Sequence, residues 1–118
     1  MAQNAVLGGR EYLVLAAVPR LRDTDLDVSL ASGVAVQKEI ERQTGRLISI
    51  GSVCTTLDRL EKKKLLTSDV SDRDGRRPKR FYSLSEPGHK TLVEAKRASD
   101  AMWKGLDRML PKLAPAGR

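Results

Sequence analysis

The stretch 48–66, ISIGSVCTTLDRLEKKKLL, limits the possible folds of this chain more than any other segment. Val53, Leu57 and Leu60 recur at helical spacing and place an apolar stripe on one side of a helix. A second side carries small polar or basic residues, namely Ser52, Thr55, Thr56, Arg59 and Lys63. Such a helix packs on a core through its first side and leaves the second side for a partner.

The polar side of this helix has the chemistry that suits a DNA groove. Small hydroxyl side chains let the backbone approach base edges, Arg59 can make a bidentate contact to guanine, and Lys62 and Lys63 suit phosphates. Ser49 precedes the helix as a good N-cap and is a further candidate for DNA contact. Because many surface helices are polar outside, a solvated face without a partner is the alternative for this helix alone.

Composition favours an anionic partner. The 118 residues make one domain, and 22 Lys plus Arg against 15 Asp plus Glu give a net charge of +7. Nucleic acid fits this charge better than a membrane surface, because aromatic residues are only 3% of the chain and no broad apolar face accompanies the lysines. The longest apolar run, 12–18, is too short to span a bilayer, so we expect a cytoplasmic protein without membrane contact.

The chain offers little for catalysis or metal binding. Its one cysteine, Cys54, has no internal partner, and with the one histidine, His89, it falls short of a zinc ligand set. No nucleophile paired with a base and no phosphate loop is visible. We therefore expect no enzyme, no metal and no cofactor.

Two helices are predicted before the central one. The first covers 10–18 and should end at Pro19, with Leu13, Ala16 and Ala17 on one face. Residues 20–33 can form a loop, a short edge strand, or both.

The second predicted helix covers 34–45 and should end at Gly45. Val36 and Ile40 form its apolar side, and Glu39 should pair with Arg42 on its outer side. Lys38 and Arg42 are weaker candidates for phosphate contact. A short connector then leads to the central helix, as in a helix-turn-helix.

A β-hairpin is predicted after the central helix. Segments 65–70 and 80–84 have strand composition, and the loop SDRDGRRPK between them has Asp74-Gly75 at its centre. The candidate DNA contacts in this hairpin are Arg76, Arg77, Lys79 and Arg80. A basic hairpin tip behind a candidate recognition helix is typical of a winged helix; a solvated loop with arginines for solubility is the alternative.

The last helix should begin after the N-cap Ser85 and continue to Leu110, where Pro111 interrupts it. It carries a coiled-coil seam of Leu92, Ala95, Ser99, Met102, Leu106 and Met109. Such a seam usually pairs two copies of a chain, although it can instead pack on its own core. Trp103, beside the seam, is a candidate contact for a small aromatic effector, and interface or core packing is the alternative.

The succession SGVAVQKEIERQTG, ISIGSVCTTLDRLEKKKLL and RRPKRFYSLSEPG resembles the PadR family of transcriptional regulators. The matches to the helix motif of that family are Gly51, Leu57, Arg59, Leu60, Glu61, Leu65 and Leu66. The matches to its wing motif are Arg77, Pro78, Lys79, Arg80, Tyr82, Leu84 and Gly88. The likeness covers about residues 8 to 110.

The resemblance implies a winged-helix domain that dimerises through its C-terminal helix and binds a pseudo-palindromic operator, usually to repress. Many members sense a small phenolic or drug-like compound near the dimer interface. This chain is similar to the short subfamily, which ends in a single helix.

Two residues depart from the family pattern. Cys54 replaces tyrosine and is expected to be a small buried hydrophobe rather than a redox sensor. Lys64 replaces glycine, so the helix should end on a costlier residue.

These observations predict a mainly α fold with a small β-hairpin, a winged helix-turn-helix followed by a long C-terminal dimerisation helix. The expected divisions are 1–84 for DNA binding, 85–110 for dimerisation and 111–118 as a flexible tail. The expected partners are double-stranded DNA, a second copy of the chain and a small aromatic effector. The alternative function is a winged-helix architectural or protein-interaction module without a specific operator. The predicted dimer contacts are Leu92, Ala95, Met102, Trp103, Leu106 and Met109.

Overall fold

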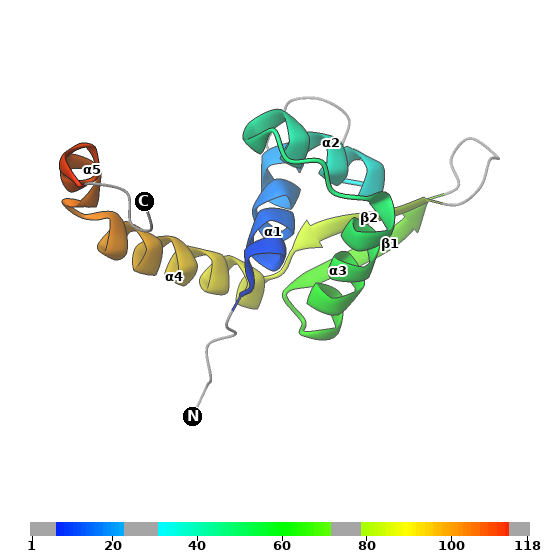
Figure 1. Ribbon diagram of the computed structural model, residues 1–118. Helices are drawn as coiled ribbons and strands as arrows, with labels where there is room; N and C mark the ends of the chain where they lie inside the picture. Colours follow the sequence, from blue (N-terminus) through cyan, green and yellow to red (C-terminus); the bar gives the residue numbers. More distant parts are fainter. Residues whose placement is uncertain (1–6, 23–30, 72–78, 114–118) are drawn as a thin grey trace.

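The computed structural model describes residues 7–22, 31–71 and 79–113, and it confirms a mainly helical winged-helix fold (Figure 1). The predicted wing residues Arg76 and Arg77, the turn Asp74-Gly75 and the end of the tail lie outside these ranges. In chain order the elements are α1 (Gly9–Arg22), α2 (Gly33–Thr44), α3 (Ile50–Lys62), β1 (Leu66–Ser71), β2 (Lys79–Leu84), α4 (Glu86–Trp103), α5 (Leu106–Met109) and the 3₁₀ turn η2 (Leu110–Lys112). None of the helices in the described ranges is long and apolar enough to cross a membrane.

Helix α1 continues past Pro19 to Arg22, so the predicted end at Pro19 is wrong. A proline inside a helix removes one hydrogen bond to the preceding turn, so the residues after it must be held by other contacts. Leu21 packs against the core and helps to hold the final turn. The buried side of α1 also differs from the predicted face, because Leu13 and Ala16 are only partly buried. The fully or almost fully buried apolar residues of α1 are Val14, Leu15, Ala17 and Val18.

Helices α2 and α3 have the caps that the sequence predicts. Gly45 ends α2 with φ 73°, and its N–H donates to the Glu41 carbonyl at 2.8 Å. Ser49 caps α3 by accepting from the Ser52 N–H at 3.1 Å. The Gln37 side chain donates to the Ile48 carbonyl at 2.8 Å, which ties the connector to α2. Gly45 thus fixes the start of the connector, and the Gln37 hydrogen bond and the Ser49 cap hold its end.

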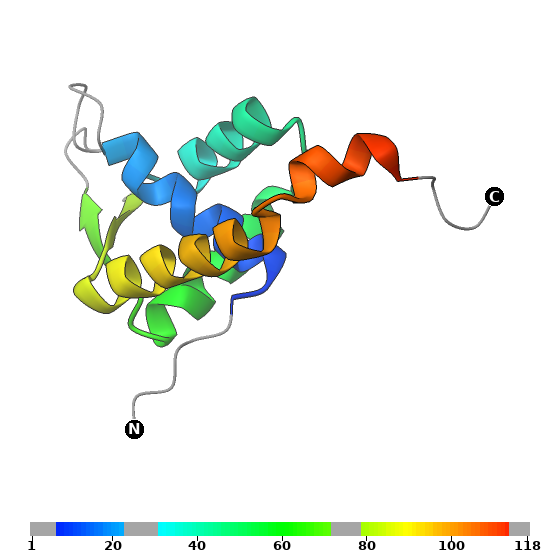
Figure 2. The same ribbon diagram turned by 90° about the vertical axis from the view of Figure 1, so that its left-hand side faces the viewer.

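The hydrophobic core lies where α1, α2 and α3 meet, and the predicted stripe of α3 enters it. Val53, Leu57 and Leu60 are all 0% exposed. Val36 and Ile40 of α2 lie in the same core, as predicted. In Figure 2, α4 (yellow to orange) passes in front of α1 (blue), and the two helices are in contact.

Glu39 lies on the inner side of α2, although the sequence places its pair with Arg42 on the outer side. Its side chain is 3% exposed and binds Arg42, the Arg20 Nε at 2.9 Å and the Gln43 Nε2 at 3.0 Å. Burial raises the pKa of Glu39, but these hydrogen bonds outweigh it and bring the pKa below its ordinary value. Because Arg20 belongs to α1, the carboxylate joins the first two helices.

The predicted hairpin forms with an antiparallel register from Leu66↔Leu84 to Ser71↔Lys79. Ser32 forms an isolated antiparallel bridge with Phe81, and the Tyr82 N–H donates to the Ala31 carbonyl at 3.0 Å. Residues 31 and 32 thus form a short edge beside β2, which is one of the predicted alternatives for 20–33; residues 23–30 of that stretch lie outside the described ranges. Lys64, at the turn between α3 and β1, has φ 66°, which confirms the costlier helix end.

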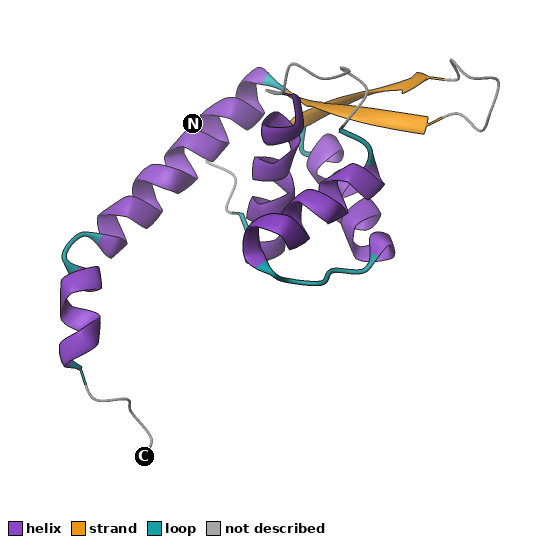
Figure 3. Ribbon diagram, turned by 90° about the horizontal axis from the view of Figure 1, so that it is seen from above, coloured by secondary structure: helices purple, strands orange, loops and turns teal. Residues whose placement is uncertain are grey.

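The C-terminal helix is interrupted, so the predicted continuous helix to Leu110 is wrong. Ser85 caps α4 as predicted, but α4 ends at Trp103 and α5 begins at Leu106. Gly105 has φ 80° between them, a conformation that glycine adopts without a steric cost. Figures 1 and 3 show α4 leading away from the bundle and α5 at its far end. The predicted seam is therefore divided, with Leu106 and Met109 beyond the break.

Candidate nucleic-acid interface

The outer side of α3 presents a set of polar side chains that we call the polar face. Thr55, Asp58, Arg59 and Lys62 are exposed, and Ser52 is half-buried. A hollow of about 400 Å³ lies along one edge of this face. The residues that line it are Arg10, Ser49, Gly51, Ser52, Thr55, Thr56 and Arg59. Five predicted contacts, Ser49, Ser52, Thr55, Thr56 and Arg59, thus lie together along the hollow.

Thr56 does not belong to the polar face, although the sequence analysis placed it there. Thr56 is only 3% exposed, and its hydroxyl donates to the Ser52 carbonyl at 2.8 Å within α3. Position 56 falls between Val53 and Leu60 on the core side of the helix, at the same spacing as the apolar stripe. A small hydroxyl residue fits there because its polar atom is satisfied by the helix itself.

Lys63 forms an ion pair with a residue of α1. It is the C-cap of α3, and its Nζ lies 2.8 Å from the Glu11 Oε2 of α1. Glu11 also accepts from the Gly8 N–H at 3.2 Å. Burial raises the pKa of Glu11, but the hydrogen bonds from Lys63 and Gly8 and the charges of Lys63 and Arg59 bring it below its ordinary value. Lys62 is exposed and is the freer phosphate candidate of the two lysines.

Two residues of this surface were missed by the sequence analysis. Asp58 is exposed, one helical turn after Thr55 and one turn before Lys62. This spacing alone places Asp58 on the same side of the helix, so the sequence contained the signal for it. Arg10, in the first turn of α1, lines the hollow beside Arg59. No local signal predicts Arg10, because its position depends on how α1 packs against α3.

The wing contributes cations at its base. Lys79 and Arg80 are exposed at the start of β2. Arg80 Nη1 donates to the Ser68 hydroxyl at 2.8 Å, and that hydroxyl donates to the Glu61 Oε2 at 2.6 Å. Of the two candidates on α2, Lys38 is exposed, whereas the guanidinium of Arg42 binds Glu39.

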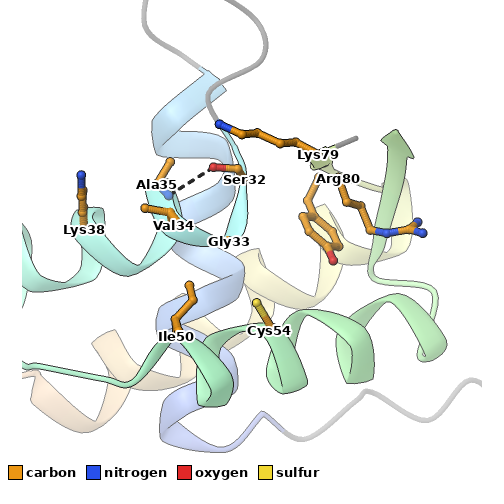
Figure 4. Close-up of a pocket in the computed structure, with 10 residues that line it drawn as sticks. Ser32, Gly33, Val34, Ala35, Lys38, Ile50, Cys54, Lys79 and Arg80 are labelled. Carbon is orange, nitrogen blue, oxygen red and sulfur yellow. Dashed lines mark hydrogen bonds between the residues drawn. The ribbon is translucent and has the colours of Figure 1, made fainter. Parts of the chain in front are cut away.

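A groove of about 470 Å³ lies between α2, α3 and β2 (Figure 4). The residues that line this α2/β2 groove are Ser32, Gly33, Val34, Ala35, Lys38, Ile50, Cys54, Lys79, Arg80 and Tyr82. Cys54 is exposed here, so the expectation of a buried hydrophobe is wrong. Its side chain lines the groove, whereas Val53, Leu57 and Leu60 form the buried side of α3. Burial raises the pKa of the Tyr82 hydroxyl above its ordinary value.

The predicted dimer contacts lie on both sides of the break at Gly105. Leu92 packs against the core of its own chain, which is the alternative considered for the seam. Ala95 and Leu106 are half-buried. Met102 is 77% exposed, and Trp103 and Met109 are each more than half exposed. Within the described ranges, no group of three or more His, Cys, Asp and Glu residues could hold a metal ion.

Comparison with models of protein sequence families identifies a family for this chain. The sequence model described as "Transcriptional regulator PadR-like family" matches residues 28–94, more than half of the chain. No curated protein matches the sequence.

Several solved structures share the fold. A PadR family transcription regulator from Clostridium difficile is 20% identical, with a TM-score of 0.68 over 87% of this chain and 99% of that one. A PadR family transcriptional regulator from Eggerthella lenta is 24% identical, with a TM-score of 0.65 over 86% and 83%. Bacillus subtilis PadR, solved in complex with operator DNA, is 19% identical, with a TM-score of 0.56 over 71% of this chain and 44% of that one.

Proposed function

Because the chain belongs to the PadR-like family of transcriptional regulators, which are not enzymes, we propose that it is a homodimeric repressor that binds a specific operator. The observation that carries this proposal is the polar face of α3. It combines exposed hydroxyl, carboxylate and guanidinium groups on one rigid helix, which are the groups that hydrogen-bond to base edges.

Arg59 is the proposed base-reading residue with the largest effect. Its guanidinium can donate two parallel hydrogen bonds to one guanine. Thr55 and Ser52 lie one and two turns before it and are small enough for α3 to approach the floor of the groove. Asp58 can accept from the amino group of cytosine, so it adds a second kind of base preference.

The surrounding cations are proposed to hold the DNA backbone. Lys62 extends the polar face of α3, and Lys38, Lys79 and Arg80 lie around the α2/β2 groove beside it. The wing residues Arg76 and Arg77 are proposed as further phosphate contacts. Such contacts orient the protein on the duplex without reading the sequence.

The exposed apolar residues near the end of α4 support a homodimer. Met102 and Trp103 would otherwise leave a large apolar surface in water, and Met109 of α5 adds to it. A two-fold dimer would present two α3 helices to two half-sites, which matches a pseudo-palindromic operator. Trp103 stays a candidate contact for a small aromatic effector at this interface.

The test is a titration of the purified protein against DNA from upstream of its own coding region, with random DNA as competitor at fixed salt. Binding at least about 10³-fold tighter than to random DNA supports an operator-specific regulator. Equal binding to both would contradict it and favour an architectural or protein-interaction module.

Two variants separate base reading from backbone contact. Arg59→Ala should weaken operator binding by about 1–3 kcal/mol and relax its specificity. Arg77→Ala should weaken binding to all DNA about equally and lower the salt slope by about one. Arg97→Ala, which removes an exposed charge from α4, is the matched control. An equal loss of operator and random binding in Arg59→Ala would contradict its base-reading role.

A further inference from the structure

The first turn of α3 exposes an apolar side chain next to the polar face. Ile50 is the first residue of α3, directly after the N-cap Ser49, and it is 41% exposed. Gly51 follows it, and a β-carbon there would have open space around it. This end of α3 is therefore accessible, and it is the end of a recognition helix that commonly contacts bases.

Ile50 belongs to a continuous apolar patch shared by two helices. Together with Cys54 of α3 and Val34 of α2, which is 50% exposed, it lines the α2/β2 groove. Gly33 allows the close contact, because a β-carbon there would lie 3.1 Å from the Cys54 Sγ and 3.7 Å from the Ile50 Cδ1. Figure 4 shows Ile50 and Cys54 projecting from α3 towards the start of α2.

The charges around this patch indicate what occupies it. Lys38, Lys79 and Arg80 line the same groove, and none of the described residues that line it is acidic. A fitting partner therefore carries negative charge and small apolar groups close together. Duplex DNA has both, because its phosphates flank a major groove whose one apolar substituent is the C5-methyl group of thymine.

We propose that Ile50 reads the C5-methyl group of a thymine in each operator half-site, with Cys54 and Val34 completing the apolar surface. The inference rests on the proposed function and adds an apolar part to the base reading. Ile50 and Cys54 lie on the side of α3 that faces α2 and β2, whereas Arg59 lies on the side that faces Arg10. The two kinds of readout thus occupy opposite edges of the same helix.

The experiment starts from an operator that the wild-type protein selects from a pool of random duplexes. Each thymine is then replaced in turn by deoxyuridine, which lacks only the methyl group. One position in each half-site should bind the wild-type protein about fourfold more weakly, the effect expected for one buried methyl group.

Variants then show whether Ile50 is the residue that contacts this methyl group. Ile50→Ser, which leaves no methyl group at this position, should bind the thymine and deoxyuridine operators equally, and Ile50→Val should keep most of the difference. Val93→Ser changes an equally exposed residue on α4 and should keep the full fourfold difference. Thermal unfolding of each variant confirms that it is folded before its affinities are compared.

The outcomes separate this inference from the function on which it rests. Specific operator binding that no deoxyuridine replacement weakens would overturn the inference and leave the repressor proposal intact. The same holds if Ile50→Ser keeps the fourfold loss. If no sequence is enriched from the pool, both proposals fail.

Discussion

The first turn of α4 lies directly against the turn between α3 and β1, because a β-carbon on Gly88 would be 1.9 Å from the Leu65 carbonyl oxygen. Two hydrogen bonds fix this junction. The Ser85 N–H donates to that same carbonyl at 3.1 Å, and the Ser85 hydroxyl donates to the Lys64 carbonyl at 2.7 Å. The helix proposed to read DNA and the helix proposed to form the dimer are therefore joined at a rigid point.

Gly88→Ala should lower the free energy of unfolding by about 1–3 kcal/mol, because the new methyl group would overlap a backbone atom that cannot move alone. Urea denaturation measures this change. Gly9→Ala is the matched control, since a β-carbon there meets no atom within 4 Å. Equal stability of both variants would contradict the close contact.

Lys64→Gly should raise the free energy of unfolding by about 1 kcal/mol. Lys64 has φ 66°, a conformation that costs a residue with a β-carbon more than it costs glycine. Lys62→Gly, at the last position of α3, should have the opposite sign, because glycine is a poor helix former. Thermal and urea unfolding of the two variants test the prediction. A loss of stability in Lys64→Gly would contradict it.

Gly51→Ala should separate stability from DNA binding. Alanine favours a helix over glycine by about 0.5–1 kcal/mol, and nothing in the described structure obstructs its methyl group. If the first turn of α3 approaches the bases, the same methyl group should weaken operator binding. Unfolding and operator titration are measured on the same preparation. A variant that is more stable and binds as well as wild type would show that this turn stays away from the DNA.

Glu39→Gln should lower stability at pH 7 by about 1.5–3 kcal/mol, because the buried side chain loses charged hydrogen bonds to Arg20 and Arg42. The folded pKa of Glu39 lies below the ordinary value of 4.5. Its contribution to stability is therefore complete above about pH 4.5 and is lost as the pH falls through the folded pKa.

The pH dependence gives the sharper measurement for Glu39. Between pH 5 and 3, wild type should lose stability more steeply than Glu39→Gln. Glu41→Gln, on the exposed side of the same helix, is the control and should keep a slope closer to that of wild type. Identical slopes for wild type and Glu39→Gln would show that the carboxylate does not contribute through its charge.

The sequence by itself determined the features that depend on neighbours within one or two turns. Ser49, Gly45 and Ser85 cap or end helices where predicted, because capping needs only a side chain or a glycine next to the helix end. The buried stripe of α3 and the two strands follow from spacing and composition in the same way.

The tertiary structure decided the features that depend on which surfaces meet. Pro19 stays inside α1 where Leu21 packs on the core, and Glu39 turns inward where Arg20 of another helix can reach it. Gly105 breaks the C-terminal helix by a left-handed turn that the seam spacing does not reveal. Arg10 lines the hollow beside Arg59 because α1 packs against α3. Local rules describe each helix, but contacts between residues far apart in the chain exist only once the helices are packed.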